Sequence, residues 1–214
     1  MKKTYAVFGL GRYGSAVARE LVDNGQDVIA VDADERAVNA VADKLPICKC
    51  ADVTDPEVIR QLSIATVDVV IIAMANNLEA SVMSVTLCKE LGVKTVIAKC
   101  ANATHQKILA RVGADKVVFP ENESGIRLAK NLLSSGFVDM VSLAKNVSII
   151  ELDVKPDWIG KNLIELHLRK KHSLNVIAIR KGDAVSVDID PTIPLTPDDH
   201  LIVIANTAKL AKLK

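Results

Sequence analysis

The chain has 214 residues, half of them hydrophobic, and its 27 Lys and Arg residues nearly balance its 26 Asp and Glu residues. This length fits two domains of modest size, and the apolar fraction is sufficient for a sizeable core. With no basic block apparent, we expect no nucleic-acid partner, because proteins that bind nucleic acid gather Lys and Arg on one face.

No stretch of the sequence is typical of a signal peptide or of a membrane-spanning helix. The longest apolar run covers residues 67–75, far fewer than the roughly 20 residues that a span requires. The N-terminal residues lead directly into an apolar strand and lack a small-residue cleavage site. We therefore expect a soluble chain in the cytoplasm.

Over the first 120 residues, short β-branched segments alternate with helical segments, which is typical of a doubly wound parallel sheet. The expected strands cover residues 5–8, 27–32, 47–51, 67–73, 94–98 and 116–119. The expected helices cover residues 12–24, 35–44, 77–91 and 104–112, with a shorter helix that begins at 55–56. The fold class is therefore α/β, with a Rossmann-like first part.

The pattern changes after Pro120. A crossover helix is expected over 122–135, and the segments that follow are those of a small α+β domain. Its expected strands cover 148–154, 175–180, 184–187 and 201–205, with helices at 162–170 and at the end of the chain. We therefore expect a first domain over 1–120, a crossover helix and linker over 121–137, and a C-terminal domain over 138–214.

A glycine loop, Gly9-Leu10-Gly11-Arg12-Tyr13-Gly14, stands between the first expected strand and the first expected helix. In such loops the first glycine permits a tight turn, the second lets backbone approach a phosphate, and the third allows close helix packing. Asp32 ends the second strand, about 20 residues further on, where a carboxylate accepts hydrogen bonds from both ribose hydroxyls. The combination predicts a site for an adenine nucleotide.

Four side chains in and after these two motifs refine the expected ligand. Asp32 would repel a 2′-phosphate and Ala33 offers it no positive charge, which disfavours NADP. Arg12 is either a solvated side chain at the start of a helix or a clamp for an additional phosphate, since guanidinium binds phosphate oxygens in pairs. Asp34 is either a second sugar contact or the cap of the next helix.

The sequence offers no catalytic constellation. A short-chain dehydrogenase needs a Tyr followed four residues later by Lys, and neither Tyr5 nor Tyr13 has this neighbour. The four histidines are scattered among charged and polar residues, as solvated side chains are. We predict a protein that senses a nucleotide and is not an enzyme. The alternative is an NAD(H)-binding redox sensor or a small NAD-dependent oxidoreductase.

The four cysteines, Cys48, Cys50, Cys88 and Cys100, lie in apolar segments without a CxxC pair or a neighbouring His. We interpret them as buried thiols that pack as small hydrophobic side chains, in preference to metal ligands or disulfides.

The chain resembles the RCK (regulator of potassium conductance) family over nearly its whole length, and within it the KtrA/TrkA-type regulatory subunits of bacterial potassium uptake, most nearly KtrA. The residues that carry the resemblance are the glycine loop, Asp32-Ala33-Asp34, Ala51-Asp52-Val53-Thr54-Asp55 and Pro120-Glu121. The resemblance implies an RCK_N domain, a crossover helix and an RCK_C domain. It also implies an octameric ring on the inner face of the membrane, beneath a KtrB/TrkH-like potassium-translocating subunit. ATP and ADP would compete for the Rossmann site and switch the ring between conformations.

The resemblance further implies roles for individual residues. The implied cofactor-binding set is Gly9, Gly11, Arg12, Tyr13, Gly14, Asp32, Asp34, Asp52, Val53 and Lys99. In this set Asp32 and Asp34 would hold the ribose, while Asp52 and Val53 would flank the adenine.

Three residues would serve the phosphates and an ion. Arg12 would meet the terminal phosphates, including those on a neighbouring subunit, and Lys99 would lie near them. Glu121 would sit at a dimer interface and help to bind Mg²⁺ or Ca²⁺ beside ATP. The alternative is that Glu121 is an acid in the first turn of a helix, where it interacts favourably with the dipole.

The resemblance also implies a second ligand, cyclic di-AMP, between two C-terminal domains. The residues at the corresponding positions are Arg169, Asn175, Val176 and Pro191.

Overall fold

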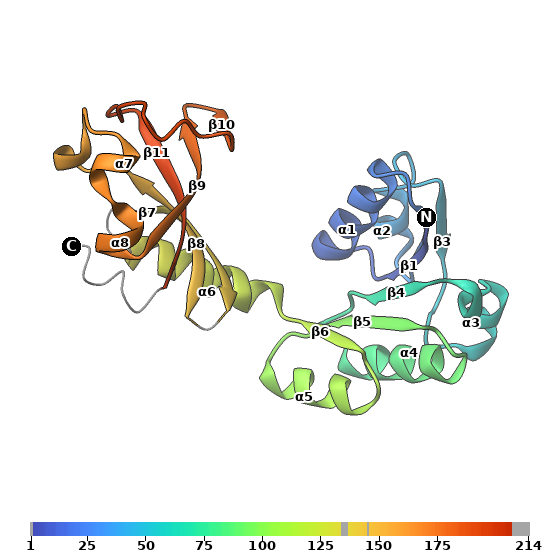
Figure 1. Cartoon of the computed structure of the whole chain (residues 1–214). Helices are drawn as coiled ribbons and strands as arrows, with labels where there is room; N and C mark the ends of the chain where they lie inside the picture. Colours follow the sequence, from blue (N-terminus) through green and yellow to red (C-terminus); the bar gives the residue numbers. More distant parts are fainter. Residues whose placement is uncertain (1, 134–136, 145, 207–214) are drawn as a thin grey trace. The chain divides into compact units, whose positions relative to one another are not determined.

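The computed structural model describes residues 2–133, 137–144 and 146–206, and the chain divides into two compact units, Met1–Pro120 and Glu121–Lys214 (Figure 1). Each unit has its own sheet and its own buried core. None of the helices in these ranges combines the length and the apolar character needed to cross a membrane.

The first unit contains a six-stranded sheet in which all neighbouring strands are parallel, in the order β3-β2-β1-β4-β5-β6. Its strands are β1 (Thr4–Phe8), β2 (Asp27–Asp32), β3 (Ile47–Cys50), β4 (Val69–Ile72), β5 (Thr95–Lys99) and β6 (Lys116–Val118). The chain winds outward from β1 to β3 and then returns to β4, so the winding direction reverses between β1 and β4. The expected Rossmann-like fold is confirmed.

The helices of this unit are α1 (Arg12–Asp23), α2 (Glu35–Asn39), α3 (Pro56–Gln61), α4 (Leu78–Glu90) and α5 (Ala103–Arg111), with the 3₁₀ turn η1 (Ile64–Thr66). Each helix from α2 to α5 follows an Asp or Asn whose side chain accepts a hydrogen bond from the first turn. α2 is shorter than the sequence predicts, because tight turns follow Asn39 and direct Val41 and Leu45 into the core.

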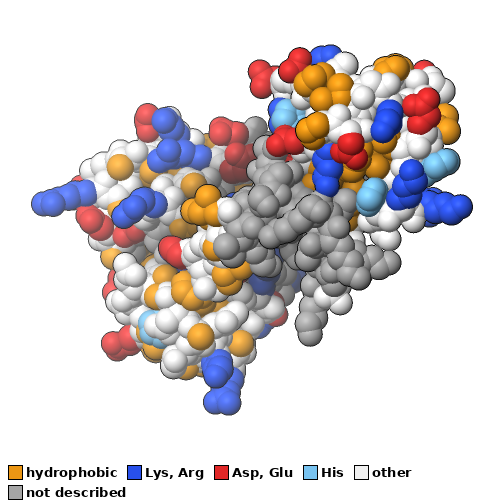
Figure 2. Space-filling view, turned by 90° about the vertical axis from the view of Figure 1, so that its left-hand side faces the viewer, with side chains coloured by type: hydrophobic (Ala, Val, Ile, Leu, Met, Phe, Trp, Pro, Cys, Tyr) orange, Lys and Arg blue, Asp and Glu red, His pale blue; other side chains and the backbone are white. Residues whose placement is uncertain are grey.

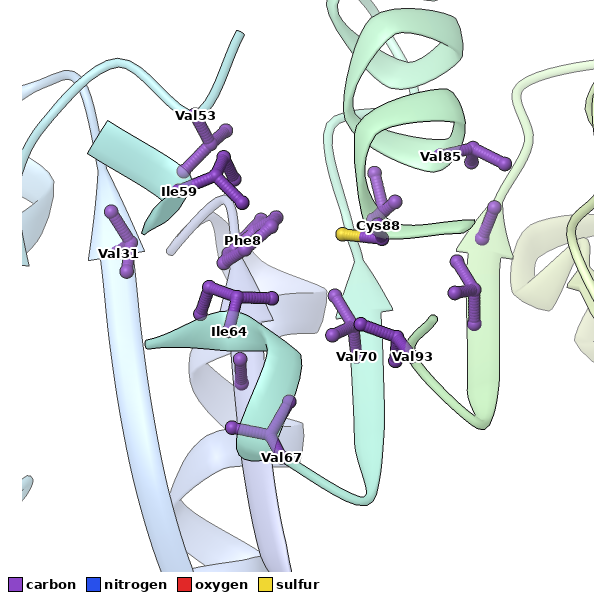
Figure 3. Packing of buried hydrophobic residues seen from close by; sticks show 14 of the residues in the cluster. Phe8, Val31, Val53, Ile59, Ile64, Val67, Val70, Val85, Cys88 and Val93 are labelled. Atoms are coloured by element: carbon purple, nitrogen blue, oxygen red, sulfur yellow. The ribbon is translucent and has the colours of Figure 1, made fainter. Parts of the chain in front are cut away.

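Buried side chains cover both faces of the six-stranded sheet, because successive strand residues point to opposite sides. Val7 belongs to the cluster under α1 and α2, whereas its neighbour Phe8 belongs to the cluster under α3, α4 and α5. Figure 3 shows Phe8 of β1 beside Val31 of β2, with Ile59 of α3 above them. The inner strands are therefore apolar on both faces, as the apolar run around β4 indicates.

The second unit contains a five-stranded antiparallel sheet in the order β10-β9-β11-β8-β7. Its strands are β7 (Phe137–Ala144), β8 (Val147–Asp153), β9 (Leu174–Lys181), β10 (Ala184–Ser186) and β11 (Asp199–Asn206). The accompanying helices are α6 (Pro120–Leu133), α7 (Leu163–Leu166) and α8 (Leu168–His172), with the 3₁₀ turn η2 (Pro156–Trp158). This is the small α+β domain that the sequence predicts.

One predicted helix of the second unit is broken in the structure. His167 adopts a left-handed backbone with φ of +48° and separates α7 from α8. Residues two apart point to nearly opposite sides of a continuous helix, whereas Leu166 and Leu168 are both buried in the same core. The break therefore lets both leucines pack inward. The predicted helix at the end of the chain falls on residues outside the described ranges.

Candidate nucleotide site

The three glycines of the loop between β1 and α1 meet different constraints. Gly9 has φ of +91°, and a Cβ on it would lie 2.8 Å from Cγ of Met74. A Cβ on Gly14 would lie 1.9 Å from the carbonyl oxygen of Gly9, so α1 packs directly against the loop. A Cβ on Gly11 would meet no described atom within 4 Å. The first and third glycines therefore shape the turn, while open space lies beside the second.

The N-terminus of α1 differs from those of the other helices in this unit. Gly11 precedes it, no described side chain caps it, and its first turn contains no acidic residue. The Ser15 hydroxyl donates back to the Gly11 carbonyl oxygen at 2.7 Å, so it leaves the helix end open. The positive end of the helix dipole is therefore directed at the space beside Gly11. Phosphate groups bind at helix ends of this kind.

Asp32 lies at the end of β2, beside the glycine loop, and both of its carboxylate oxygens accept backbone hydrogen bonds. Oδ2 accepts from the N–H of Leu10 at 2.6 Å, and Oδ1 accepts from the N–H of Asp34 at 2.8 Å. These bonds fix the orientation of the half-buried carboxylate. Each oxygen retains a lone pair for a further donor, an arrangement that suits the two hydroxyls of a ribose.

The two other acidic residues of the expected site are held in local turns. Oδ1 of Asp34 accepts from the N–H of Arg36 at 2.9 Å, so Asp34 is the cap of α2, one of its two expected roles. Asp52 is exposed, and its Oδ1 accepts from the N–H and the hydroxyl of Thr54 at 2.9 and 2.7 Å. The backbone bond first, and then the hydroxyl bond, lower the pKa of the Asp52 carboxyl from its ordinary value.

Two positively charged side chains lie at the start of α1. Nζ of Lys99, at the end of β5, lies 5.4 Å from the centroid of the Tyr13 ring, a cation–π contact. Through this contact a side chain of β5 lies beside the glycine loop. Arg12 is exposed at the first position of α1 and forms no ion pair with another described residue. The contact between Tyr13 and Lys99 has no signal in the sequence, because the two residues are far apart in the chain.

Val53 lies close to the site, but its side chain belongs to the core. It is 4% exposed and lies next to Ile59, close to Phe8 (Figure 3). Its carbonyl oxygen accepts a hydrogen bond from the Ser84 hydroxyl at 3.2 Å. Only the backbone of Val53 is therefore left to flank an adenine.

Glu121 and Glu123 lie in the first turn of α6, and both are exposed. An acid at this position interacts favourably with the helix dipole. Among the residues that the structure describes, no three His, Cys, Asp or Glu side chains gather as metal ligands. The expected metal-binding role of Glu121 stays a prediction.

The residues expected at a second ligand site lie in the C-terminal unit. Arg169 is exposed on α8, while in β9 Asn175 is exposed and Val176 packs partly on the core. Because α8 packs against β9, these three residues lie in the same part of the unit. Pro191 is exposed in the connection between β10 and β11.

A group of ionisable side chains that the sequence analysis missed crosses three strands of the second sheet. Nδ1 of His200 lies 2.9 Å from Oδ1 of Asp153 and 3.9 Å from Oε1 of Glu151. Nε of Arg180 donates to the same Glu151 oxygen at 2.5 Å. The antiparallel register of β8, β9 and β11 brings these residues together, so their spacing in the sequence does not predict the contact. Arg180 of β9 and Glu151 of β8 form an ion pair, and His200 of β11 lies beside Glu151 and Asp153.

The cysteines differ from one another in exposure. Cys88 and Cys100 are fully buried, as expected, and burial raises the pKa of the Cys88 thiol to about 12. Cys50 is exposed and Cys48 is half-buried, so the expectation of four buried thiols is wrong for these two. The reason is that β3 is an edge strand, paired only with β2.

Comparison with known proteins identifies relatives over the whole chain. The TrkA-N domain model matches residues 5–120, and the TrkA-C domain model matches residues 147–214. The chain is 35% identical to the Ktr system potassium uptake protein C of Bacillus subtilis (strain 168), over 100% of this chain and 97% of that protein. It is 33% identical to the Ktr system potassium uptake protein A of Vibrio alginolyticus, over 99% and 97%. Among solved structures, it is similar to the GsuK channel, with a TM-score of 0.71 and 18% identity over 100% of this chain and 39% of that chain.

Proposed function

Because the chain belongs to the RCK family of TrkA-N and TrkA-C domain proteins, which includes the non-enzymatic Ktr potassium uptake proteins, we propose that it is the cytoplasmic nucleotide-binding subunit that regulates a membrane potassium transporter. ATP and ADP compete for the glycine loop of its first unit. The observation that carries this proposal is the uncapped N-terminus of α1 beside the fixed carboxylate of Asp32.

The charges around the loop favour ATP and ADP over NAD. Asp32 suits the ribose of any of the three, so it does not discriminate among them. Arg12 and Lys99 add two positive charges near the start of α1. ATP and ADP carry more negative charge on their phosphates than the pyrophosphate of NAD does, so they gain more from these cations.

Switching requires that ATP and ADP differ in their affinity for the two conformations of the regulator, since a ligand that binds both equally shifts nothing. Arg12 provides this difference by meeting the third phosphate of ATP, including one held by a neighbouring subunit. Its exposure and its lack of an ion-pair partner among the described residues support such a reach.

The functional unit is a ring of this chain, an octamer built from dimers, beneath a membrane subunit of the KtrB/TrkH type. Exposed apolar side chains on α6 support self-association: Ile126 is 48% exposed, Leu128 60% and Leu132 78%. An apolar surface of this kind is usual at an interface between chains.

Two further ligands belong to this proposal. Mg²⁺ or Ca²⁺ binds at the dimer interface with Glu121 and the phosphates of ATP as ligands, since carboxylate and phosphate oxygens are the donors that both ions prefer. Cyclic di-AMP binds between two C-terminal units, at Arg169, Asn175, Val176 and Pro191. The exposure of Arg169, Asn175 and Pro191 supports this second site.

The second candidate is an NAD(H)-binding redox sensor. The Asp32 carboxylate, which accepts from two backbone donors, is compatible with this candidate, because it suits the adenosine ribose of NAD as well as that of ATP or ADP.

Calorimetric titration of the purified chain with ATP, ADP and NADH, each with and without Mg²⁺ or Ca²⁺, separates the two candidates. We expect tight binding of ATP and ADP, with the divalent ion strengthening ATP binding alone. NADH binding well above both nucleotides would overturn the proposal in favour of the redox sensor.

A further inference from the structure

Buried polar side chains, more than exposed charges, distinguish particular parts of this chain. On the face drawn in Figure 2, the described side chains of both signs are mingled, so no patch of one sign singles out a ligand there. Few polar side chains in the described ranges are buried: Ser15, Ser81, Ser84, Ser148 and Asp199. Burial of a polar group costs free energy unless the group is hydrogen-bonded, so its partner shows which part of the chain it holds in place.

Ser84, on α4, holds a part of the chain that is distant in sequence. Its side chain is 0% exposed, and its hydroxyl donates to the carbonyl oxygen of Val53 at 3.2 Å. A hydroxyl on a helix commonly bonds to the carbonyl oxygen four residues earlier, as Thr86 does to Val82 at 2.9 Å. Ser84 instead links α4 to the turn that follows β3.

The peptide group between Val53 and Thr54 extends this link to Asp52. Its carbonyl oxygen accepts from Ser84, and its N–H donates to Oδ1 of Asp52 at 2.9 Å. Because a peptide group is planar, the direction of its C=O also determines the direction of its N–H. The Ser84 hydroxyl therefore contributes to the orientation of the exposed Asp52 carboxylate, although the two side chains are not in contact.

The turn that carries Asp52 lies on the side of β2 away from the glycine loop. β2 stands between β1, which leads into the loop, and β3, which leads into the turn. The N–H of Ala51 donates to the carbonyl oxygen of Asp32 at 3.0 Å, so the turn is joined to the end of β2. A nucleotide with its ribose at Asp32 and its phosphates at the glycine loop therefore directs its base toward this turn.

We propose that Ser84 is a positioning residue for the recognition of adenine, acting through the turn at Asp52; this inference rests on the proposed nucleotide site. The Asp52 carboxylate accepts a hydrogen bond from the 6-amino group of adenine and repels the 6-carbonyl oxygen of guanine. Ser84 does not touch the base. It holds the peptide plane that aligns the carboxylate.

The test is calorimetric titration of the full chain with ATP and GTP. We expect the wild type to prefer ATP, and Ser84→Ala to reduce this preference by about three- to tenfold, as for the loss of one hydrogen bond. The ratio of ATP to ADP affinity should not change, because both carry the same base. Asp52→Ala should also reduce the preference, and adding Ser84→Ala to it should have no further effect.

Ser81→Ala is the matched control. Ser81 lies about one turn earlier on α4, is 1% exposed, and donates to the carbonyl oxygens of Met74 and Asn77 at 3.0 and 2.9 Å. The control therefore loses the same atoms from the same helix, and its stability in urea should fall about as much. It should nevertheless keep the wild-type preference for ATP over GTP, because its bonds go to another turn.

Equal losses of preference in the two serine variants would show a structural role alone and would overturn the proposal. GTP binding by the wild type as tight as ATP binding, or additive effects of Ser84→Ala and Asp52→Ala, would overturn it too. Failure of the wild type to bind ATP or ADP would overturn the proposed function and this inference together. Normal ATP binding with an unchanged preference in Ser84→Ala would overturn this inference alone.

Discussion

The backbone N–H of Leu10 donates a hydrogen bond of 2.6 Å to Oδ2 of Asp32 and so ties the glycine loop to the end of β2. The second oxygen of Asp32 accepts from Asp34, at the point where the chain turns into α2. The carboxylate that is proposed to hold the ribose is thus fixed by the loop that is proposed to hold the phosphates. The two halves of the site are structurally coupled.

Replacing Asp32 should therefore weaken nucleotide binding. Asp32→Asn exchanges one accepting oxygen for an amide nitrogen, which cannot accept a hydrogen bond from Leu10, Asp34 or a ribose hydroxyl. A hydrogen bond to a charged group contributes about 1.5–3 kcal/mol, so we expect ADP affinity to fall at least tenfold in a calorimetric titration.

Asp34→Asn is the matched control for Asp32→Asn. Asn caps helices about as well as Asp, so α2 should persist and the affinity should change little. A tenfold loss in this control would assign Asp34 to the sugar as well. Wild-type affinity in Asp32→Asn would refute the ribose role of Asp32.

The glycine loop permits a test that separates folding from binding. In Gly14→Ala the new methyl would lie 1.9 Å from the carbonyl oxygen of Gly9, so α1 must shift. We expect a loss of about 1–3 kcal/mol or more in the free energy of unfolding, measured with urea, as for other overpacked sites.

Gly11→Ala is the counterpart of Gly14→Ala. Gly11 has φ of −65°, which any residue adopts, and open space lies beside it. Its free energy of unfolding should change by less than about 1 kcal/mol, while its methyl group obstructs a phosphate and weakens ATP binding. Equal destabilisation by the two substitutions would contradict these separate roles.

Much of this architecture follows from the sequence, because local rules determine it. The glycine loop, the capping residues Asp55 and Asn77, and the apolar strands are each recognisable from neighbouring residues. The contact between Tyr13 of α1 and Lys99 of β5 depends on the strand order, and the group around Glu151 depends on the register of the second sheet. Sequence spacing reveals neither. The exposure of Cys50 could not be predicted from its residue type either, because only the strand order shows that β3 is an edge strand.

Asp115 should make the stability of the first unit depend on pH. Its Oδ2 accepts from the N–H of Val96 at 2.7 Å and lies 3.0 Å from Nζ of Lys89. The backbone bond, ahead of the lysine, lowers the pKa of the Asp115 carboxyl from its ordinary value. A lowered pKa adds stability above the unfolded-state value of about 3.9, and this stability disappears as the pH falls through the native value.

Asp115→Asn should thus be less stable than the wild type at neutral pH, and the difference should shrink in acid below about pH 4. Urea unfolding at both pH values measures this change. A deficit that stays constant with pH would show that the charge of Asp115 has no part in stability.

The cysteines should react in the order of their exposure. A disulfide reagent attacks the thiolate, and burial raises the pKa of Cys88 to about 12, so this thiol stays protonated near neutral pH. We expect Cys50 to react first and Cys48 more slowly, with Cys88 and Cys100 reacting only after unfolding in urea. Cys50→Ser should remove the fast phase. Fast labelling of Cys88 in the native protein would contradict the described packing.

Arg12→Ala should narrow the difference in affinity between ATP and ADP. Arg12 is exposed and forms no ion pair with another described residue, so its removal leaves the fold intact, as an unchanged melting temperature should verify. The guanidinium is proposed to meet the third phosphate, which ADP lacks, so ATP affinity should fall by about tenfold, as for the loss of a charge-assisted hydrogen bond. ADP affinity should change by much less. Calorimetric titrations with both nucleotides measure the two changes, and equal losses for ATP and ADP would remove Arg12 as the residue that distinguishes them.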